Sequence, residues 1–130
     1  IHSDQKNQMK QSDIINLVKL NVSLCYEMRN QLLRGDLKEF GISMNEAWHA
    51  KRKFSTKVSS PDLDNIYNNA IKSGALGGKL LGAGGGGFFL FYVEPKNRTK
   101  LTKYINETGL NQKNFKFESD GVLGWKVKNN

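Results

Sequence analysis

The feature that most constrains this sequence is a glycine-rich run that leads directly into an aromatic segment. Between Gly74 and Gly87, eight of fourteen residues are glycine, and glycine loses more backbone entropy on folding than any other residue. A flexible linker would be followed by polar residues, whereas Phe88–Val93 reads Phe-Phe-Leu-Phe-Tyr-Val. We therefore expect the run to belong to a folded core, with Lys79–Leu81 as a strand, Gly82–Gly87 as the connection and Phe88–Val93 as a buried strand.

A connection without side chains is chemically suited to phosphate, because successive glycines can turn several backbone N–H groups to one side. Gly82, Gly84 and Gly87 have the spacing of a dinucleotide fingerprint, but that fingerprint opens a helix and here a strand follows. A Walker loop is excluded because Gly74 stands one residue too close to Gly78–Lys79, and a leucine follows where Ser or Thr is needed.

The run resembles the third conserved motif of the GHMP kinases, the superfamily of galactokinase, homoserine kinase, mevalonate kinase and phosphomevalonate kinase. The resemblance covers roughly residues 36–104, about half of the chain. Besides the glycine run, the residues that carry the resemblance are Asn45, Glu46, Ala47, Trp48, Lys51, Arg52, Ala70 and Gly74–Lys79. They look most like the branch that contains D-glycero-D-manno-heptose 7-phosphate kinase. The alternative is a glycine-rich hairpin that only lets two layers pack closely.

The resemblance implies the C-terminal domain of a kinase that moves the γ-phosphoryl group of ATP to a sugar or sugar phosphate with the help of Mg²⁺. In the family the phosphate loop and catalytic residues lie in an N-terminal domain. No catalytic residue or metal ligand is therefore assigned here, and the chain alone is expected to be inactive. Its expected partners are the sugar substrate and that N-terminal domain.

Two sets of residues are expected to line the shared cleft, as the resemblance implies. The first, at the domain junction and near phosphate or substrate, is Gly82, Ala83, Gly84, Gly85, Gly86 and Gly87. The second, flanking a sugar-phosphate pocket, is Trp48, Lys51 and Arg52. The structural alternative for the second set places Trp48 in the core and the Lys51 ammonium in water. His49 points away from this stripe and is expected at the surface.

Composition bounds the class of protein. A chain of 130 residues fits a single domain with a modest core. The formal charge of +8 favours anionic partners, and one cysteine is compatible with a reducing cytoplasm. The longest apolar run is too short to cross a bilayer. The start, Ile1-His2-Ser3-Asp4, has neither Met nor a signal peptide, so we expect a chain cut from a longer protein.

Two other functions are open. Phe88–Tyr92 has a faint likeness to the aromatic strand of an RNA-recognition module, and the domain is basic. However, the leading Lys or Arg is missing, and a continuous apolar strand suits burial better than an exposed platform. The third possibility is a non-catalytic assembly domain.

Apolar periodicity predicts four helices, over about 4–34, 37–54, 61–73 and 98–108. In the first, Ile14, Leu17, Val18, Leu24, Cys25, Met28 and Leu32 are expected on one buried face, which Asn21 interrupts. Near the C-terminus, Phe115–Phe117 and Leu123–Val127 alternate around an Asp120-Gly121 turn and predict two antiparallel strands. The fold class is therefore α+β, with helices packed on an antiparallel sheet of about four strands, ferredoxin-like as the resemblance implies.

Overall fold

The computed structural model describes residues 2–54, 59–81 and 88–112. Along the chain it contains α1 (His2–Arg34), α2 (Leu37–Phe54), α3 (Pro61–Lys72), β1 (Ala75–Leu81), β2 (Phe88–Val93), the short 3-10 helix η1 (Pro95–Asn97) and α4 (Arg98–Glu107). The α+β class is confirmed. The two predicted C-terminal strands, over residues 115–127, lie outside the described residues, as does the connection Gly82–Gly87.

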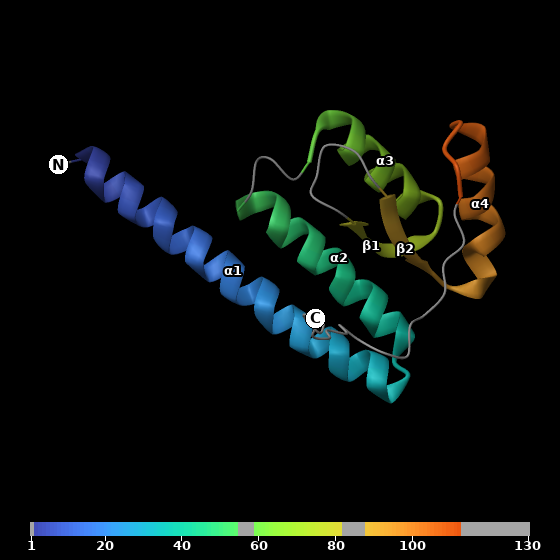
Figure 1. Cartoon of the computed structure of the whole chain (residues 1–130), viewed down its shortest axis with the longest axis horizontal. Coiled ribbons are helices and arrows are strands. Elements are labelled where there is room, and N and C mark those ends of the chain that lie inside the picture. Colours follow the sequence, from blue (N-terminus) through green and yellow to red (C-terminus); the bar gives the residue numbers. More distant parts are fainter. Residues whose placement is uncertain (1, 55–58, 82–87, 113–130) are drawn as a thin grey trace, which may run out of the picture.

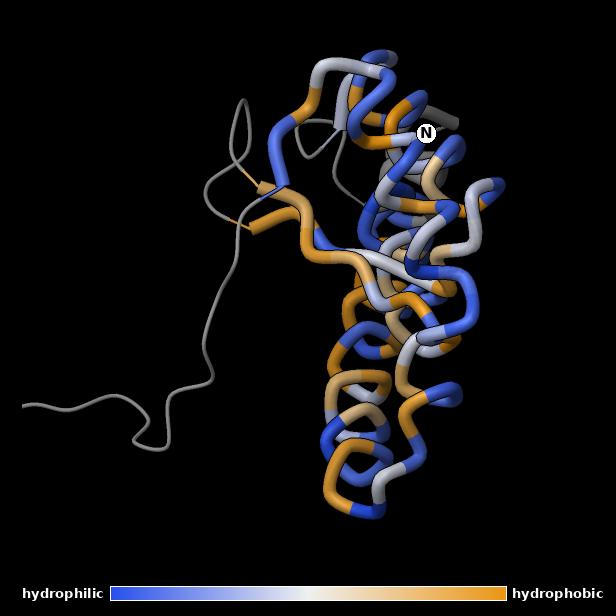
Figure 2. The backbone as a smooth tube through the Cα atoms, turned by 90° about the vertical axis from the view of Figure 1, so that its right-hand side faces the viewer, coloured by the Kyte–Doolittle hydropathy of each residue, from blue (hydrophilic) through white to orange (hydrophobic). Residues whose placement is uncertain are grey.

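The elements are arranged around a β-hairpin (Figure 1). Helices α1 and α2 lie side by side and antiparallel, and α2 separates α1 from the hairpin. On the other side, α3 and α4 pack together, and Leu101 of α4 contacts Ala70 of α3 and Ala75 of β1 in one buried cluster. The far end of the hairpin stands out from the helices (Figure 2). No helix among the described residues is long and apolar enough to cross a membrane.

The helix ends follow the capping chemistry of the sequence. Ser60 caps α3, its hydroxyl oxygen accepting a hydrogen bond from the Leu63 N–H at 3.3 Å, and Pro61 begins the helix. Gly35, Gly74 and Gly109 follow the ends of α1, α3 and α4 with φ of 78°, 110° and 75°, a region that glycine enters at little cost. The predicted bounds of α2 are confirmed.

The prediction of one buried face on α1 is wrong in part. Leu24 is 3% exposed against α2, and Asn21 Nδ2 donates a hydrogen bond of 3.1 Å to the Ala47 carbonyl, which explains a polar residue in the stripe. Cys25, however, is exposed rather than in the core. So are Ile14, Val18 and Leu32, at 42%, 42% and 48%. Successive helical residues differ by 100° around the axis, so the single neighbour α2 covers only one narrow stripe.

The hairpin strands pair antiparallel from Ala75 opposite Val93 to Leu81 opposite Phe88, with an irregularity between Ala75 and Gly77. The first strand thus begins four residues earlier than predicted, because the glycines before Lys79 are themselves part of the ladder. The second strand has the predicted bounds.

Two glycines, Gly41 on α2 and Gly77 on β1, allow the helix and the hairpin to meet almost backbone to backbone. A Cβ on Gly77 would lie 2.7 Å from the Asn45 amide nitrogen and closer still to the Gly41 carbonyl oxygen of α2. A Cβ on Gly41 would lie 2.5 Å from the ring of Tyr92. At Gly77 and Gly41, close packing of two layers accounts for glycine without any ligand.

This contact gives a prediction about stability. We expect Gly77→Ala to lower the free energy of unfolding by roughly 1–3 kcal/mol, because the added methyl group must displace main chain. The matched control is Gly35→Asn, where nothing lies within 4 Å of a Cβ and Asn tolerates positive φ, so its cost should stay below about 1 kcal/mol. Urea denaturation of the three proteins measures both. Equal stabilities would contradict the close contact.

Candidate functional site

The base of the hairpin is held by the buried phenol of Tyr67 on α3, which is 1% exposed. Its O–H donates a hydrogen bond of 2.7 Å to Asn45 Oδ1 on α2, and its oxygen accepts one of 3.2 Å from the Gly78 N–H on β1. Burial raises the pKa of Tyr67 to about 12, and the hydrogen bond from Gly78 opposes that rise. One hydroxyl therefore joins three elements and stays protonated at neutral pH.

An aromatic cluster surrounds this phenol. Trp48 on α2 is 3% exposed and stacks on Tyr67 with ring centroids 4.9 Å apart. Phe89 contacts Trp48 edge to face at 5.5 Å and stacks on Phe91 at 5.2 Å. Leu80, opposite Phe89 in the hairpin, completes the cluster. Trp48 thus lies in the core beneath the hairpin. Phe89 and Phe91 face this cluster, unlike the exposed aromatics on which RNA-recognition modules stack bases.

Arg52, one turn beyond Trp48, is tied to α3. Its Nη2 lies 2.7 Å from Asp64 Oδ2, and the Ser59 hydroxyl donates to Asp64 Oδ1 at 2.5 Å. The side chains of Arg52 and Asp64 are 35% and 28% exposed, so the pair is partly screened by water. Arg52 Nε is buried and has no hydrogen-bond partner among the described residues. The guanidinium fastens the end of α2 to the start of α3.

The end of α2 is basic on several sides. Lys51 is half-buried, whereas Lys53 and His49 are exposed, as predicted for His49. Burial, followed by the charges of Arg52 and Lys53, lowers the pKa of His49 below its usual 6.5. This shift favours the neutral imidazole, and because Arg52 is paired with Asp64, the unpaired positive charge of this corner, within the described part of the chain, comes from Lys51 and Lys53.

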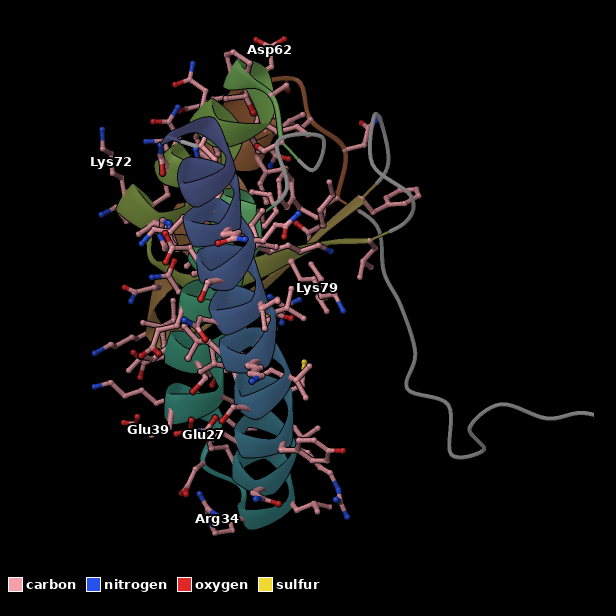
Figure 3. The ribbon with its side chains drawn as sticks, turned by 90° about the vertical axis from the view of Figure 1, so that its left-hand side faces the viewer. Glu27, Arg34, Glu39, Asp62, Lys72 and Lys79 are labelled. Carbon is pink, nitrogen blue, oxygen red and sulfur yellow. The ribbon has the colours of Figure 1, made fainter. Side chains whose placement is uncertain are left out.

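The projecting half of the hairpin is different. Side chains alternate across a strand, so that Leu80 is buried while Lys79 and Leu81 are exposed. Leu81 and its partner Phe88 are 41% and 58% exposed. Figure 3 shows Lys79 on the part of the hairpin that stands clear of the helices. The described part of the hairpin therefore has a buried aromatic base and an exposed end at Leu81 and Phe88.

The structure places one of the two predicted sets of site residues. Trp48, Lys51 and Arg52 lie on the last turns of α2, with the indole and guanidinium engaged by the protein itself. Gly82–Gly87 lies outside the described residues. The sequence reasoning missed Tyr67 as a structural junction and Asp64 as the partner of Arg52. Asp64 is separated from Arg52 by a loop, so no helical spacing could have indicated the pair.

No cluster of three or more His, Cys, Asp or Glu side chains that could hold a metal ion occurs in the part of the chain that the structure describes. The carboxylate nearest the basic corner, Asp64, is already held by Arg52 and Ser59. We therefore assign no described side chain to Mg²⁺.

Comparison with known families identifies the family of this chain. Residues 28–109 match the family described as GHMP kinases C terminal, a span that includes α2, α3, both strands and α4. The chain belongs to the GHMP kinase family. The predicted resemblance is confirmed, and in this chain the aromatic cluster and Tyr67 support the base of the glycine hairpin.

Three relatives show the range of this family. D-glycero-alpha-D-manno-heptose 7-phosphate kinase of Campylobacter jejuni is 34% identical over 101 residues, 78% of this chain and 30% of that protein. Galactokinase of Streptomyces coelicolor is 33% identical over 73 residues, 56% of this chain and 19% of that protein. L-fucokinase/L-fucose-1-P guanylyltransferase of Bacteroides fragilis is 28% identical over 98 residues, 75% and 10% of the two chains. The chain therefore spans less than a third of the length of these relatives.

The raised pKa of Tyr67 predicts a loss of stability at alkaline pH. The phenol titrates near 10 when unfolded and near 12 when folded, so its contribution is complete below pH 10 and is lost as the pH rises toward 12. We expect the ionisation of Tyr67 to lower the free energy of unfolding by about 1 kcal/mol as the pH rises from roughly 9 to 11.

Urea denaturation across this range, with Tyr67→Phe as the comparison, measures the effect. The variant should be less stable near neutral pH by roughly 1–3 kcal/mol, since the Gly78 N–H and Asn45 amide lose their partner. It should also depend less steeply on alkaline pH. Parallel pH profiles for the two proteins would show that this phenol is not the titrating group.

Proposed function

We propose that the chain is the C-terminal domain of a kinase that transfers the γ-phosphoryl group of ATP to a sugar or sugar phosphate. The observation that carries the proposal is the family match across residues 28–109. The relatives support it, because each is named as a kinase of a sugar or a sugar phosphate. The proposal includes a cytoplasmic location, and a four-stranded, ferredoxin-like sheet to which residues 115–127 contribute.

The chain is one half of a shared cleft in this proposal. Phosphoryl transfer depends on positioning and on electrostatic stabilisation of the transferred group. ATP and Mg²⁺ are held mainly by an N-terminal domain, and Mg²⁺ would supply charge neutralisation at the phosphates. This chain supplies the connection Gly82–Gly87, whose backbone approaches phosphate or substrate, and the rigid base that holds the connection in place.

The basic end of α2 favours a phosphorylated sugar. Lys51 is the half-buried cation here, and Arg52 is already committed to Asp64, so the net positive charge available to an anion comes largely from the lysine. Trp48 contributes indirectly, because its packing on Tyr67 fixes the last turns of α2, which carry Lys51. We infer a substrate such as heptose 7-phosphate, with galactose-like and fucose-like sugars as the alternatives.

A substrate panel tests this function. The complete protein, incubated with ATP and Mg²⁺, should release ADP with D-glycero-D-manno-heptose 7-phosphate faster than with galactose or fucose. The 130-residue chain should show no turnover under the same conditions. ADP release by the chain alone would refute the division between two domains, and no release by the complete protein with any of the sugars would refute the kinase.

The role of Lys51 can be separated from general charge. We expect Lys51→Ala to raise the KM for the sugar phosphate about tenfold, the loss of one cation–phosphate interaction worth about 1.4 kcal/mol. The matched control is Lys53→Ala, which removes the same charge from an exposed position two residues away and should leave KM within about twofold. Steady-state kinetics of the complete enzyme measures both. Equal effects of the two variants on KM would show that Lys51 contributes only general surface charge and does not bind the phosphate.

The connection is tested at its centre. In the complete enzyme, Gly85→Val should lower kcat/KM by roughly a hundredfold, since a β-branched side chain resists positive φ and fills the space left for phosphate. Thermal unfolding should change far less, by a few degrees at most. A variant with unchanged kinetics would leave the connection as a packing feature only.

A further inference from the structure

Helix α1 carries a second apolar stripe, separate from the one that packs on α2. Its members recur at intervals of three and four residues, as in the a and d positions of a heptad repeat. We call this set the heptad stripe: Ile15, Val18, Val22, Cys25 and Leu32, with Arg29 in the remaining position and Tyr26 and Leu33 beside it. It extends over nearly three heptads of the 33-residue helix.

The heptad stripe is exposed along its length. Ile15, Val22 and Tyr26 are 53%, 50% and 63% exposed, and Leu33 is 72% exposed. The residues that face α2, by contrast, follow a different register through Leu17, Asn21, Leu24, Met28 and Gln31. A helix that contacts one neighbour normally has polar residues outside that contact. Two apolar stripes on one helix therefore indicate two neighbours, of which α2 is one.

The charges around the heptad stripe indicate what covers it. Lys19 and Arg29 lie on or beside the stripe, whereas Glu27 lies on the other side of α1, toward Glu39 of α2 (Figure 3). The rim is therefore basic. A complementary partner has an apolar surface with acidic residues at its edge. A second copy of this chain fits poorly, because each copy carries a formal charge of +8 and the same basic rim.

The size of the heptad stripe supports an intramolecular partner. Stable complexes between separate proteins involve about 20–30 residues on each side, far more than the stripe offers. Contacts between domains of one polypeptide can be smaller, because covalent linkage supplies a high effective concentration. The chain spans 30% of the length of its heptose kinase relative, so such a protein has ample polypeptide for a second domain.

We propose that the heptad stripe is the docking face of α1 for the N-terminal domain of the same kinase, through an apolar surface rimmed by acidic residues. This inference rests on the proposed function for the existence of that domain. It assigns a second contact between the domains, made by the long helix and distinct from the hairpin.

Cys25, within the heptad stripe, reports on coverage without any activity assay. We expect the reaction of Cys25 with a maleimide, followed by mass spectrometry of its peptide, to be at least about tenfold slower in the complete kinase than in the 130-residue chain. In the complete kinase, Val22→Lys should restore the rate to within about threefold of the chain, because a buried lysine would force the surfaces apart. Val22 is half exposed in the chain, so the chain carrying this change should unfold as before.

A control thiol separates docking from general protection. Ser23 is exposed and lies off both stripes of α1, so Ser23→Cys in a Cys25→Ser background should react equally in the two proteins. Equal rates for Cys25 itself would overturn the proposal. Protection already present in the 130-residue chain and rising with its concentration would overturn it in favour of self-association. The kinase assay tests the proposed function separately. If Cys25 is protected in a complete protein that has no kinase activity, the docking face stands and the proposed reaction is refuted.

Discussion

The close approach of α2 to β1 at Gly41 and Gly77 is the contact on which the rest of the fold depends. It brings the helix backbone within reach of the strand, so that Asn45, one turn further along α2, lies beside β1. Tyr67 can then donate to Asn45 and accept from Gly78 with one hydroxyl. A side chain at either glycine would separate the layers, and a phenol of fixed length could no longer join the three elements.

This geometry also explains why the core is aromatic. At Gly41 and Gly77 the helix and the hairpin approach closely, whereas nearer the end of α2 large flat side chains lie between them. Trp48 stacks on Tyr67, and Phe89 contacts the indole from β2. The last turns of α2 are thereby fixed relative to the hairpin, which holds Lys51 and the Arg52–Asp64 pair in a constant position beside the proposed cleft.

Local signals predicted much of this structure, and the failures have physical causes. The bounds of α2 and β2 and the cap at Ser60 follow from periodicity and capping, which are properties of neighbouring residues. The buried face of α1 could not be read in the same way, because its apolar residues form two stripes and the sequence does not say which one α2 covers. Asp64 and Tyr67 escaped notice because their roles arise only when α3 folds back onto α2. The identity of the family was accessible because its motif is continuous in sequence.

The glycine run is best understood as two segments under different demands. Gly77 and Gly78 lie within β1, where packing against α2 and the ring of Phe91 leaves no room for a Cβ. That demand ends where the hairpin leaves the core, since Leu81 and Phe88 are already exposed. Close packing therefore accounts for Gly77 and Gly78, the two glycines within the described strand. For Gly82–Gly87 we propose a different demand, because glycine costs entropy wherever it is retained in a folded chain and close approach by phosphate in the shared cleft would offset that cost.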